Sequence, residues 1–266
     1  KYIDDAGLSS VSAAWYQGSP HDNGAGMLWG EAAGGELIHM GAYQGHATVS
    51  DSKKPMLITY GVIVNGGILV NSRGERFGNE NVGYSEFSTA VLAQGAGVVE
   101  LFGQSTYEAC KDTRLQEVEK QGLIMQHESL EAVAETHGLS KAILQQTVDA
   151  VNAAAVAGKV DNHGRHWDET PRPGGPGPLS PPFRSIPVRG ALFHTQGGLR
   201  VDIHGCVQQS SGAVVPGLLA AGGAAAGVSG GGVEGYLSGN GLLTAVVYGK
   251  AAGDTSSAMF AAAAKL

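Results

Sequence analysis

The sequence predicts an α/β protein, and three observations support this fold class. An apolar run at 214–221, typical of a strand, ends in Gly222-Gly223, and a second glycine cluster precedes an almost wholly apolar helix at 242–252. Residues 129–157 have the spacing of amphipathic helices, and short β signals flank tight turns elsewhere. A strand, a glycine loop and a helix N-terminus together let the backbone approach a flat or anionic ligand closely.

Composition narrows the classes of protein. The 266 residues are enough for one large domain or two. Only 15% of residues are charged and 42% are hydrophobic, which favours extensive buried surface. The net charge of −7 without a basic tract argues against a nucleic-acid partner. No apolar run reaches the roughly 18 residues of a membrane span, and no signal peptide is evident, so we expect a cytoplasmic protein.

The cysteines and histidines predict neither a disulfide framework nor a metal site. The two cysteines are Cys110 and Cys206, and no Cys/His spacing is that of a zinc site. His163 and His166 lie beside Asp161, but in a polar stretch that favours a solvated turn over a metal site.

The first half of the chain predicts one helix and several short strands. A small-residue pattern at 27–40 predicts a helix that packs closely on a neighbour. Apolar runs predict strands at 58–64 and 68–71, the second paired with 75–77 in a hairpin that turns at Gly74. Residues 88–101 have a mixed pattern that predicts no definite element.

The second half begins with the clearest helical region. Its apolar residues recur at spacings of four, three and four, Gly138 interrupts the pattern, and Ser129 is suited to cap the helix. The apolar residues are Leu144, Val148, Val151 and Ala155. The proline- and glycine-rich stretch 171–187 predicts a crossing between two structural units. A second hairpin is expected between 199–202 and 206–208.

Two short motifs suggest functions that their context disfavours. Gly24 to Gly30 fits a GxGxxxG pattern, but a polar turn precedes it where a dinucleotide site needs a strand, so close helix packing or a loop beside a flavin is favoured. Residues 227–231 fit GxSxG, with His194 and Asp202 as conceivable partners of Ser229. A strand should end directly at such a motif and the histidine should come last, so a serine hydrolase is a remote alternative.

The sequence alone does not decide the roles of four aromatic and histidine residues. His194 precedes the pair Gly197-Gly198 and could face a cleft, or it could be a core histidine bonded to the backbone. The same alternatives apply to His46. Tyr84 and Tyr236, taken alone, are typical of core or interface aromatics.

Taken in order, these segments resemble the flavoprotein family of fumarate reductase and succinate dehydrogenase, which includes FAD-dependent ketosteroid dehydrogenases. The resemblance spans nearly the whole chain, and several collinear motifs carry it together. They are Gln44-Gly-His46-Ala-Thr48, Gly66-Gly-Ile-Leu-Val-Asn71, Gly74-Glu-Arg-Phe77 with Asn79-Glu80, Phe183-Arg-Ser-Ile-Pro187, His194-Thr-Gln-Gly-Gly198, Val215-Pro-Gly217, Ala221-Gly222, Ser238-Gly-Asn240-Gly-Leu242 and Tyr248-Gly249.

The resemblance implies a domain organisation. Residues 1–41 and 194–266 would be parts of an FAD-binding, Rossmann-like domain, and 42–193 an inserted α+β capping domain. The flavin would contact residues of both FAD-binding segments, namely Asn23, Gly24, Gly222, Gly223, Gly239, Asn240, Gly241 and Leu242. The family's N-terminal GxGxxG unit is not among these residues, so we expect an upstream segment or a second polypeptide to supply it.

Departures from the family pattern alter the expected substrate. Arginines that clamp a dicarboxylate and deliver a proton in the family correspond here to Tyr236 and Tyr84, and the glutamate and arginine of the proton route to Tyr60 and Ile63. Without those cations a dicarboxylate would leave its charge unpaired in a dry cleft. Gly223 replaces the usual glutamate after Ala-Gly, and the T-G-D-G turn survives only in part before Gly24.

The resemblance therefore predicts an FAD-dependent oxidoreductase that acts on a carbon–carbon bond beside a carbonyl, in the manner of the ketosteroid dehydrogenase branch. Tyr84 or Tyr236 would handle the proton, since a tyrosine can act as a general acid or base. His46 and His194 would orient the substrate, a small carbonyl or enone compound. The alternative is a non-catalytic flavoprotein subunit or binding module, which the altered flavin contacts favour.

Overall fold

The computed structural model describes residues 11–12, 14–111, 113–168 and 177–264. The chain forms two compact units. Unit 1 comprises residues 1–44 and 192–266, and unit 2 comprises residues 45–191. Residues 1–10 of the first predicted segment and 171–176 of the predicted crossing lie outside the described residues.

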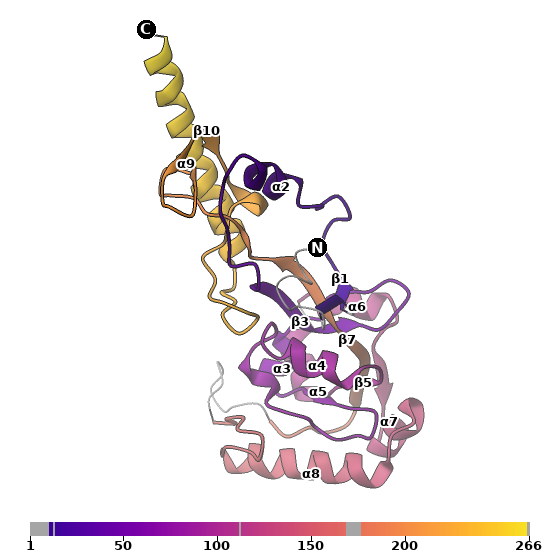
Figure 1. Ribbon diagram of the computed structural model, residues 1–266. Coiled ribbons are helices and arrows are strands. Elements are labelled where there is room, and N and C mark those ends of the chain that lie inside the picture. The colour runs from indigo at the N-terminus through magenta and orange to yellow at the C-terminus, as the bar shows by residue number, and fades with distance from the viewer. Residues whose placement is uncertain (1–10, 13, 112, 169–176, 265–266) are drawn as a thin grey trace. The chain divides into compact units, whose positions relative to one another are not determined.

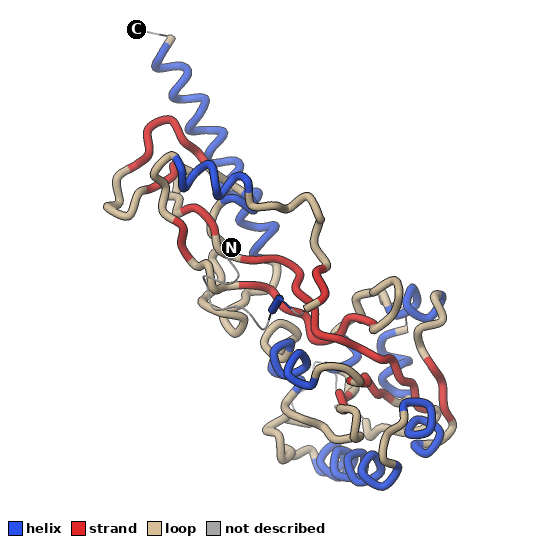
Figure 2. Tube along the Cα trace, turned by 45° about the vertical axis from the view of Figure 1, so that its right-hand side comes forward, coloured by secondary structure: helices blue, strands red, loops and turns tan. Residues whose placement is uncertain are grey.

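Unit 2 is built on a sheet in which the long strand β7 has the most partners (Figures 1 and 2). β5 lies between β4 and β7 and is antiparallel to both, and β3 and β6 also pair with β7. The strands are β3 (Tyr43–Ser50), β4 (Ile68–Val70), β5 (Val98–Phe102), β6 (Met125–His127) and β7 (Phe183–Thr195). Successive side chains of a strand point to opposite faces, so both faces of β5 can be buried.

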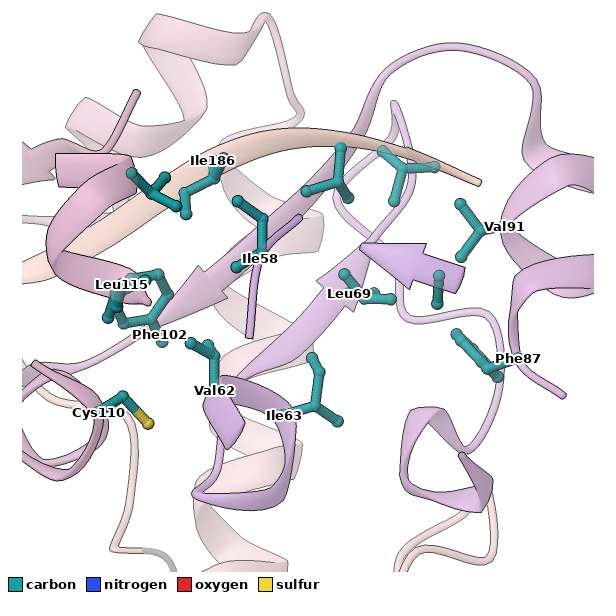
Figure 3. Packing of buried hydrophobic residues seen from close by; sticks show 14 residues of the cluster. Ile58, Val62, Ile63, Leu69, Phe87, Val91, Phe102, Cys110, Leu115 and Ile186 are labelled. Atoms are coloured by element: carbon teal, nitrogen blue, oxygen red, sulfur yellow. The ribbon is translucent and has the colours of Figure 1, made fainter. Parts of the chain in front are cut away.

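Helices and 3₁₀ turns cover this sheet. They are α3 (Gly61–Val64), η2 (Glu80–Val82), α4 (Ser88–Gln94), α5 (Gln104–Cys110), α6 (Leu115–Lys120), α7 (Leu130–His137) and α8 (Lys141–Ala157). One hydrophobic core, drawn in Figure 3, contains Val98 and Phe102 of β5 together with residues of α3, α4, α5 and α6. A second core contains Val99 and Leu101 of β5 and packs against α7 and α8.

The amphipathic region folds as predicted. Gly138 adopts the left-handed conformation between α7 and α8, and the Ser129 hydroxyl caps α7 by accepting a hydrogen bond from Ala132 N. Leu144, Val148 and Val151 are buried in the second core. Burial of each such side chain contributes roughly 1.5–3 kcal/mol, so packing of this face dominates the stability of α8.

Unit 1 contains two small antiparallel pairs and two longer helices. β2 pairs with β8 and β9 pairs with β10. The elements are β1 (Trp15–Tyr16), α2 (Ala25–Ala32), β2 (Leu37–Ile38), β8 (Gly198–Leu199), β9 (Cys206–Gln208), β10 (Val214–Leu219), η3 (Gly222–Ala224) and α9 (Asn240–Ala263). The last residues of β7 also belong to this unit, where Gln17 N donates to Leu192 O.

The GxGxxxG segment serves close packing in unit 1. A Cβ atom on Gly30 would lie 2.3 Å from Leu199 Cδ1, and one on Gly26 would lie 3.0 Å from Ala224 Cβ. The glycines therefore let α2 lie directly against β8 and η3, as one of the two interpretations predicted.

Both predicted hairpin turns are confirmed. Val70 bridges Arg76 around Gly74, whose φ is 92°, and Val201 bridges Val207 around Gly205, whose φ is 76°. Positive φ favours glycine at both turns.

Two predicted elements are wrong in part. Residues 27–40 do not form one helix: α2 ends at Ala32, Gly34 has a φ of 96°, and β2 follows. Residues 58–64 are not a strand, since 61–64 form α3, and Figure 3 shows Val62 and Ile63 reaching into the first core. A four-residue apolar run suits a buried helical turn as well as a buried strand, so periodicity could not separate them.

The C-terminal strand and helix exist but are not buried. In β10 only Val215 is buried, and α9 runs from Asn240 to Ala263 with only Asn240 buried. Leu242, Val246 and Phe260 are 83%, 72% and 75% exposed. Within the described chain no second layer packs on this apolar helix face, which explains the difference. Among the helices of the described residues, none is both long and apolar enough to cross a membrane.

Candidate functional site

The N-terminus of α9 presents backbone donors in unit 1. Gly239 precedes the helix with a φ of 82°, and no side chain caps the helix. The first N–H groups of an α-helix have no intrahelical acceptor, so those of Gly241 and Leu242 are available to a ligand. The positive end of the helix dipole lies at the same place, and together they favour an electron-rich group.

Asn240 anchors this helix start. Its side-chain Nδ2 donates to Ser229 Oγ at 2.7 Å and to Leu237 O. Its Oδ1 is buried and has no hydrogen-bond partner among the described residues. A Cβ on Gly227 would lie 3.2 Å from this Oδ1 and 2.3 Å from Gln196 Oε1, so a side chain at position 227 would displace the Gln196 amide.

Ser229 is therefore a structural residue, and the hydrolase alternative is wrong on geometry. Its hydroxyl oxygen accepts hydrogen bonds from Asn240 and from Leu237 N, and the side chain is buried. Within the described part of the chain, no histidine or carboxylate is hydrogen-bonded to Ser229, so the general base of a triad is absent.

Two cavities of unit 1 adjoin these elements. The first, about 590 Å³, is lined by Asn23, Gly24, His194 and Gly223 among others. The second, about 320 Å³, is lined by Gly222, Gly223, Gly241 and Leu242 among others, and by His194 as well. The structure thus brings together residues from both predicted flavin-contacting segments. Gly24 is in the left-handed conformation, and the Asn23 side chain accepts a hydrogen bond from Ala25 N.

His194 lies at the edge of both cavities. Its Nε2 is hydrogen-bonded to the Gln196 amide, and burial lowers the pKa of His194. The Tyr236 ring packs edge-on against it, with ring centroids 6.1 Å apart. The structure therefore pairs these two predicted residues, and it adds Gln196, a partner that sequence reasoning missed.

The residues around the second cavity fit the ring end of FAD. A Cβ on Gly222 or Gly223 would meet no atom within 4 Å, so these glycines leave open a surface on which a flat ring system can lie. The α9 N–H groups are donors of the kind that the carbonyl-bearing edge of such a ring accepts. Gly223, where the family has glutamate, thus contributes space in place of a charged contact.

A separate cluster of His46, Tyr60 and Tyr84 lies in unit 2, and we call it the aromatic cluster. The His46 and Tyr84 rings are stacked with centroids 4.9 Å apart. Tyr60 packs edge-on against both, at 5.7 Å from His46 and 5.8 Å from Tyr84. Two predicted site residues thus lie together, and Tyr60 joins them.

Backbone pairing holds the cluster. Ala47 N donates to Tyr84 O, and Gly45 N donates to Ser85 Oγ. A Cβ on Gly45 would lie 2.0 Å from Ser88 Oγ, so only glycine lets β3 approach the segment of Tyr84 this closely.

His46 is neutral. Its Nδ1 accepts a hydrogen bond from Thr48 N at 3.1 Å, which leaves the ring proton on Nε2. Burial lowers the pKa of His46 to about 3. The ring can therefore donate a hydrogen bond to a carbonyl oxygen without carrying a charge.

Tyr60 is neutral as well. Its hydroxyl donates to Glu80 O, and burial, aided by the charges of Glu80 and Glu100, raises its pKa well above the ordinary value. The nearby guanidinium of Arg165 is committed elsewhere: it is buried, bonds to Gly67 O and Ile63 O, and lies 3.5 Å from Glu80. It is not available to a substrate carboxylate.

Glu100 is a further residue that sequence reasoning missed. Its side chain is fully buried in β5, and neither carboxylate oxygen has a hydrogen-bond partner among the described residues. Desolvation raises its pKa to about 8. A lone acid within the apolar run Val98-Val-Glu-Leu-Phe102 was the signal available in the sequence. Among the residues with described positions, no group of three or more His, Cys, Asp or Glu side chains could bind a metal ion.

Comparisons with known proteins identify relatives. The chain is 31% identical over 244 residues to an NADH:acrylate oxidoreductase of Vibrio harveyi, covering 90% of this chain and 23% of that protein. It is 32% identical over 212 residues to a 4-oxocyclohex-2-ene-1-carboxylate 5-dehydrogenase of Sinomonas cyclohexanicum, covering 70% and 35%. The open conformation of a flavocytochrome c3 fumarate reductase matches with a TM-score of 0.64 and 27% identity, over 87% of this chain and 39% of that one.

The chain therefore spans between about a quarter and two fifths of the length of these relatives. Its mixed strands and helices have the fold of FAD-binding flavoproteins, as the sequence predicted. The model of the FAD binding domain family matches residues 6–242, and the chain belongs to this family, whose cofactor is FAD.

Proposed function

We propose that the protein is an FAD-dependent oxidoreductase acting on a carbon–carbon bond beside a carbonyl, with an enone or ketosteroid-like substrate. The observation that carries the proposal is the uncharged aromatic cluster. His46 and Tyr60 are neutral, and Arg165 is bound to protein acceptors. A ketone oxygen can accept hydrogen bonds from neutral donors, whereas a dicarboxylate would lose its hydration without gaining a paired cation.

The relatives support the reaction type. They are named an acrylate oxidoreductase, a fumarate reductase and a dehydrogenase of 4-oxocyclohex-2-ene-1-carboxylate, whose ring carries a ketone. Each named compound has a carbon–carbon double bond next to a carbonyl carbon.

Each group has a proposed part. Bound FAD supplies the donor or acceptor of a hydride at flavin N5. Tyr84 gives a proton to, or takes one from, the substrate carbon, with Tyr236 as the second candidate. His46 and His194 orient the carbonyl by hydrogen bonding. The N–H groups of Gly241 and Leu242 stabilise negative charge at the edge of the flavin ring.

The organisation of the chain is part of the proposal. Residues 1–41 and 194–266 would belong to the FAD-binding domain and 42–193 to the capping domain, which excludes water from the reaction. A segment or second polypeptide carrying GxGxxG would supply the pyrophosphate side of the flavin site. The exposed apolar face of α9, with Leu242 and Val246, supports a protein partner there. A cytoplasmic location stays a prediction.

Substitution of Tyr84 by Phe tests the proposal. General acid–base catalysis contributes about 10²- to 10⁴-fold, so Y84F should lower kcat by at least about a hundredfold with an unchanged flavin absorbance spectrum. Tyr107→Phe is the matched control, because the Tyr107 hydroxyl bonds to exposed Glu119 in the same unit. Unchanged turnover in Y84F would remove Tyr84 from the mechanism. A colourless native protein, purified with all its subunits, would favour the non-catalytic alternative.

A further inference from the structure

The side chain of Gln196 is held beside the ring of His194. The backbone N–H of Gln196 donates to Ala42 O, and its carbonyl oxygen accepts a hydrogen bond from Gly227 N, each at 2.8 Å. The residue is 4% exposed. A Cβ on Gly227 would lie 2.3 Å from Gln196 Oε1, so the glycine leaves the space that the amide fills. Main-chain bonds and close packing together position this amide.

The amide determines which nitrogen of His194 carries the ring proton. Gln196 Nε2 is hydrogen-bonded to His194 Nε2. An amide nitrogen donates and does not accept, so His194 Nε2 is the acceptor and the proton of the neutral ring is on Nδ1. His46 has the opposite arrangement, because its Nδ1 accepts from Thr48 N. The two histidines of the proposed site therefore offer different ring nitrogens as donors.

The surroundings of His194 favour a neutral ring. Burial lowers its pKa, and a hydrogen bond donated to Nε2 stabilises the neutral form as well. The first turn of α9 lies beside the ring, since a Cβ on Gly241 would lie 3.4 Å from His194 Nε2. The positive end of the helix dipole is at this turn and opposes a second proton on the ring.

The titratable groups near His194 do not offset this preference. Tyr236 packs edge-on against the ring, and Glu234 before it acts on Tyr43. Among the described residues that line the second cavity, His194 is the one titratable group. The titratable residues that line the first cavity with His194 are Tyr16, His21 and Asp22. Burial, and not the charge of a neighbour, shifts the pKa of His194.

The Nδ1–H group of His194 is the donor left for a ligand. Within the described part of the chain, the ring has one hydrogen-bond partner, the Gln196 amide, which occupies Nε2. His194 lines both cavities of unit 1. A neutral donor at the edge of a cavity suits an uncharged acceptor such as a ketone oxygen. A carboxylate beside the neutral ring would lose hydration without gaining a cation.

We propose that Gln196 is a positioning residue that holds His194 in the neutral Nδ1–H form, in which the ring donates a hydrogen bond to the ketone oxygen of the substrate. The inference rests on the proposed function, which gives His194 the task of orienting that carbonyl. Flavin also has carbonyl oxygens that could accept the same bond. The experiments below distinguish the two acceptors.

Nitrogen-15 NMR tests the tautomer directly in the native flavin-loaded protein, prepared with all its subunits and labelled histidine. Wild type should carry the His194 proton on Nδ1 and keep it there from pH 7 to pH 9. The signals that His194→Asn lacks identify the ring. A proton on Nε2 in wild type would mean that the Gln196 amide accepts the bond, and it would overturn the proposal without any variant of Gln196.

Two substitutions of similar size change the donor. Gln196→Met gives Nε2 no donor, so the proton should divide between the two nitrogens. Its kcat/KM for an enone should fall about two- to tenfold, the range expected for one hydrogen bond.

Gln196→Glu reverses the bond, because its carboxylate accepts from Nε2–H and raises the pKa of His194. The charged ring keeps its Nδ1–H, whereas the neutral ring then has its proton on Nε2. The kcat/KM of this variant relative to wild type should therefore fall about two- to tenfold as the pH rises through the new pKa. Gln209→Glu makes the same change elsewhere in unit 1 and should match wild type at every pH.

Further outcomes separate the acceptors and the two proposals. Substrate-free Gln196→Met should have the flavin absorbance spectrum of wild type. A changed spectrum with an unchanged KM would assign the bond to flavin and overturn the substrate role. Wild-type enone kinetics in both Gln196 variants would overturn it too. Absent enone turnover in wild type with the proton on Nδ1 would instead refute the proposed function and leave the tautomer established.

Discussion

Replacement of Glu100 by Met should stabilise unit 2 by an amount that grows with pH. Burial raises the pKa of Glu100 from 4.5 to about 8. Between these values the folded protein binds a proton that the unfolded chain releases, so the wild-type protein loses stability as the pH rises. A tenfold change in an ionisation constant corresponds to about 1.4 kcal/mol, so the penalty at pH 7 is about 3 kcal/mol. Met fills a similar volume and does not titrate.

Urea unfolding at several pH values measures this effect. Trp167 is buried in unit 2, so its fluorescence in a background with Trp15→Phe and Trp29→Phe reports the unfolding of that unit. The difference in unfolding free energy between Glu100→Met and wild type should increase by about 1.4 kcal/mol per pH unit from pH 5 to pH 8. Glu86→Gln, an exposed change, should show no such increase. A difference that is constant over this range would show that Glu100 is ionised in the folded protein and would refute the reasoning.

Three further results are expected. Glu80→Gln should cost about 3–5 kcal/mol in urea unfolding, because it leaves buried Arg76 and Arg165 without their carboxylate. The half-exposed Glu75→Gln should cost little. Gly198→Ala should destabilise unit 1 by about 1–3 kcal/mol, since its Cβ would lie 2.6 Å from Ala225 C. Gly223→Ala meets no atom within 4 Å, so it should leave the stability of unit 1 intact and weaken FAD binding in a flavin titration. The His46 ring protons should keep constant NMR shifts from pH 5 to 8, because burial lowers the pKa of His46 from 6.5 to about 3. The unfolded chain binds this proton below pH 6.5, so the free energy of unfolding should fall as the pH drops from 6.5 towards 3.

Local patterns in the sequence predicted those helices and turns whose conformation depends on residues close to one another in the chain. The hairpin at Gly74 follows from a glycine between two β runs, and α7 and α8 follow from apolar spacing with a break at Gly138. α3 could not be predicted this way, because its four apolar residues give no periodicity and Val62 and Ile63 are buried on every side. The exposure of α9 was missed for the opposite reason: an apolar helix is expected to be covered, and within the described residues α9 is not.

Family resemblance supplied the candidate site residues, but their arrangement depends on long-range pairing. His46, Tyr60 and Tyr84 come from three segments separated by some 14 and 24 residues, and the contact of β3 with the segment of Tyr84 requires glycine at position 45. Glu100 is more distant still, and only the alternation of β5 and its register with β4 and β7 place it on the same core as Tyr60. No local pattern could encode those placements.

Electrostatics connects these features with the choice of substrate. A site that binds a dicarboxylate needs cations whose charge is not already neutralised. In unit 2 the buried Arg76 is paired with Glu80 and Asp161, and the buried Arg165 donates to a backbone carbonyl. The same burial keeps His46 uncharged and Glu100 protonated. An anionic substrate beside these groups would meet no unneutralised buried cation among the described residues of the cluster. A neutral enone avoids this cost, which is why the uncharged aromatic cluster and the proposed substrate preference agree.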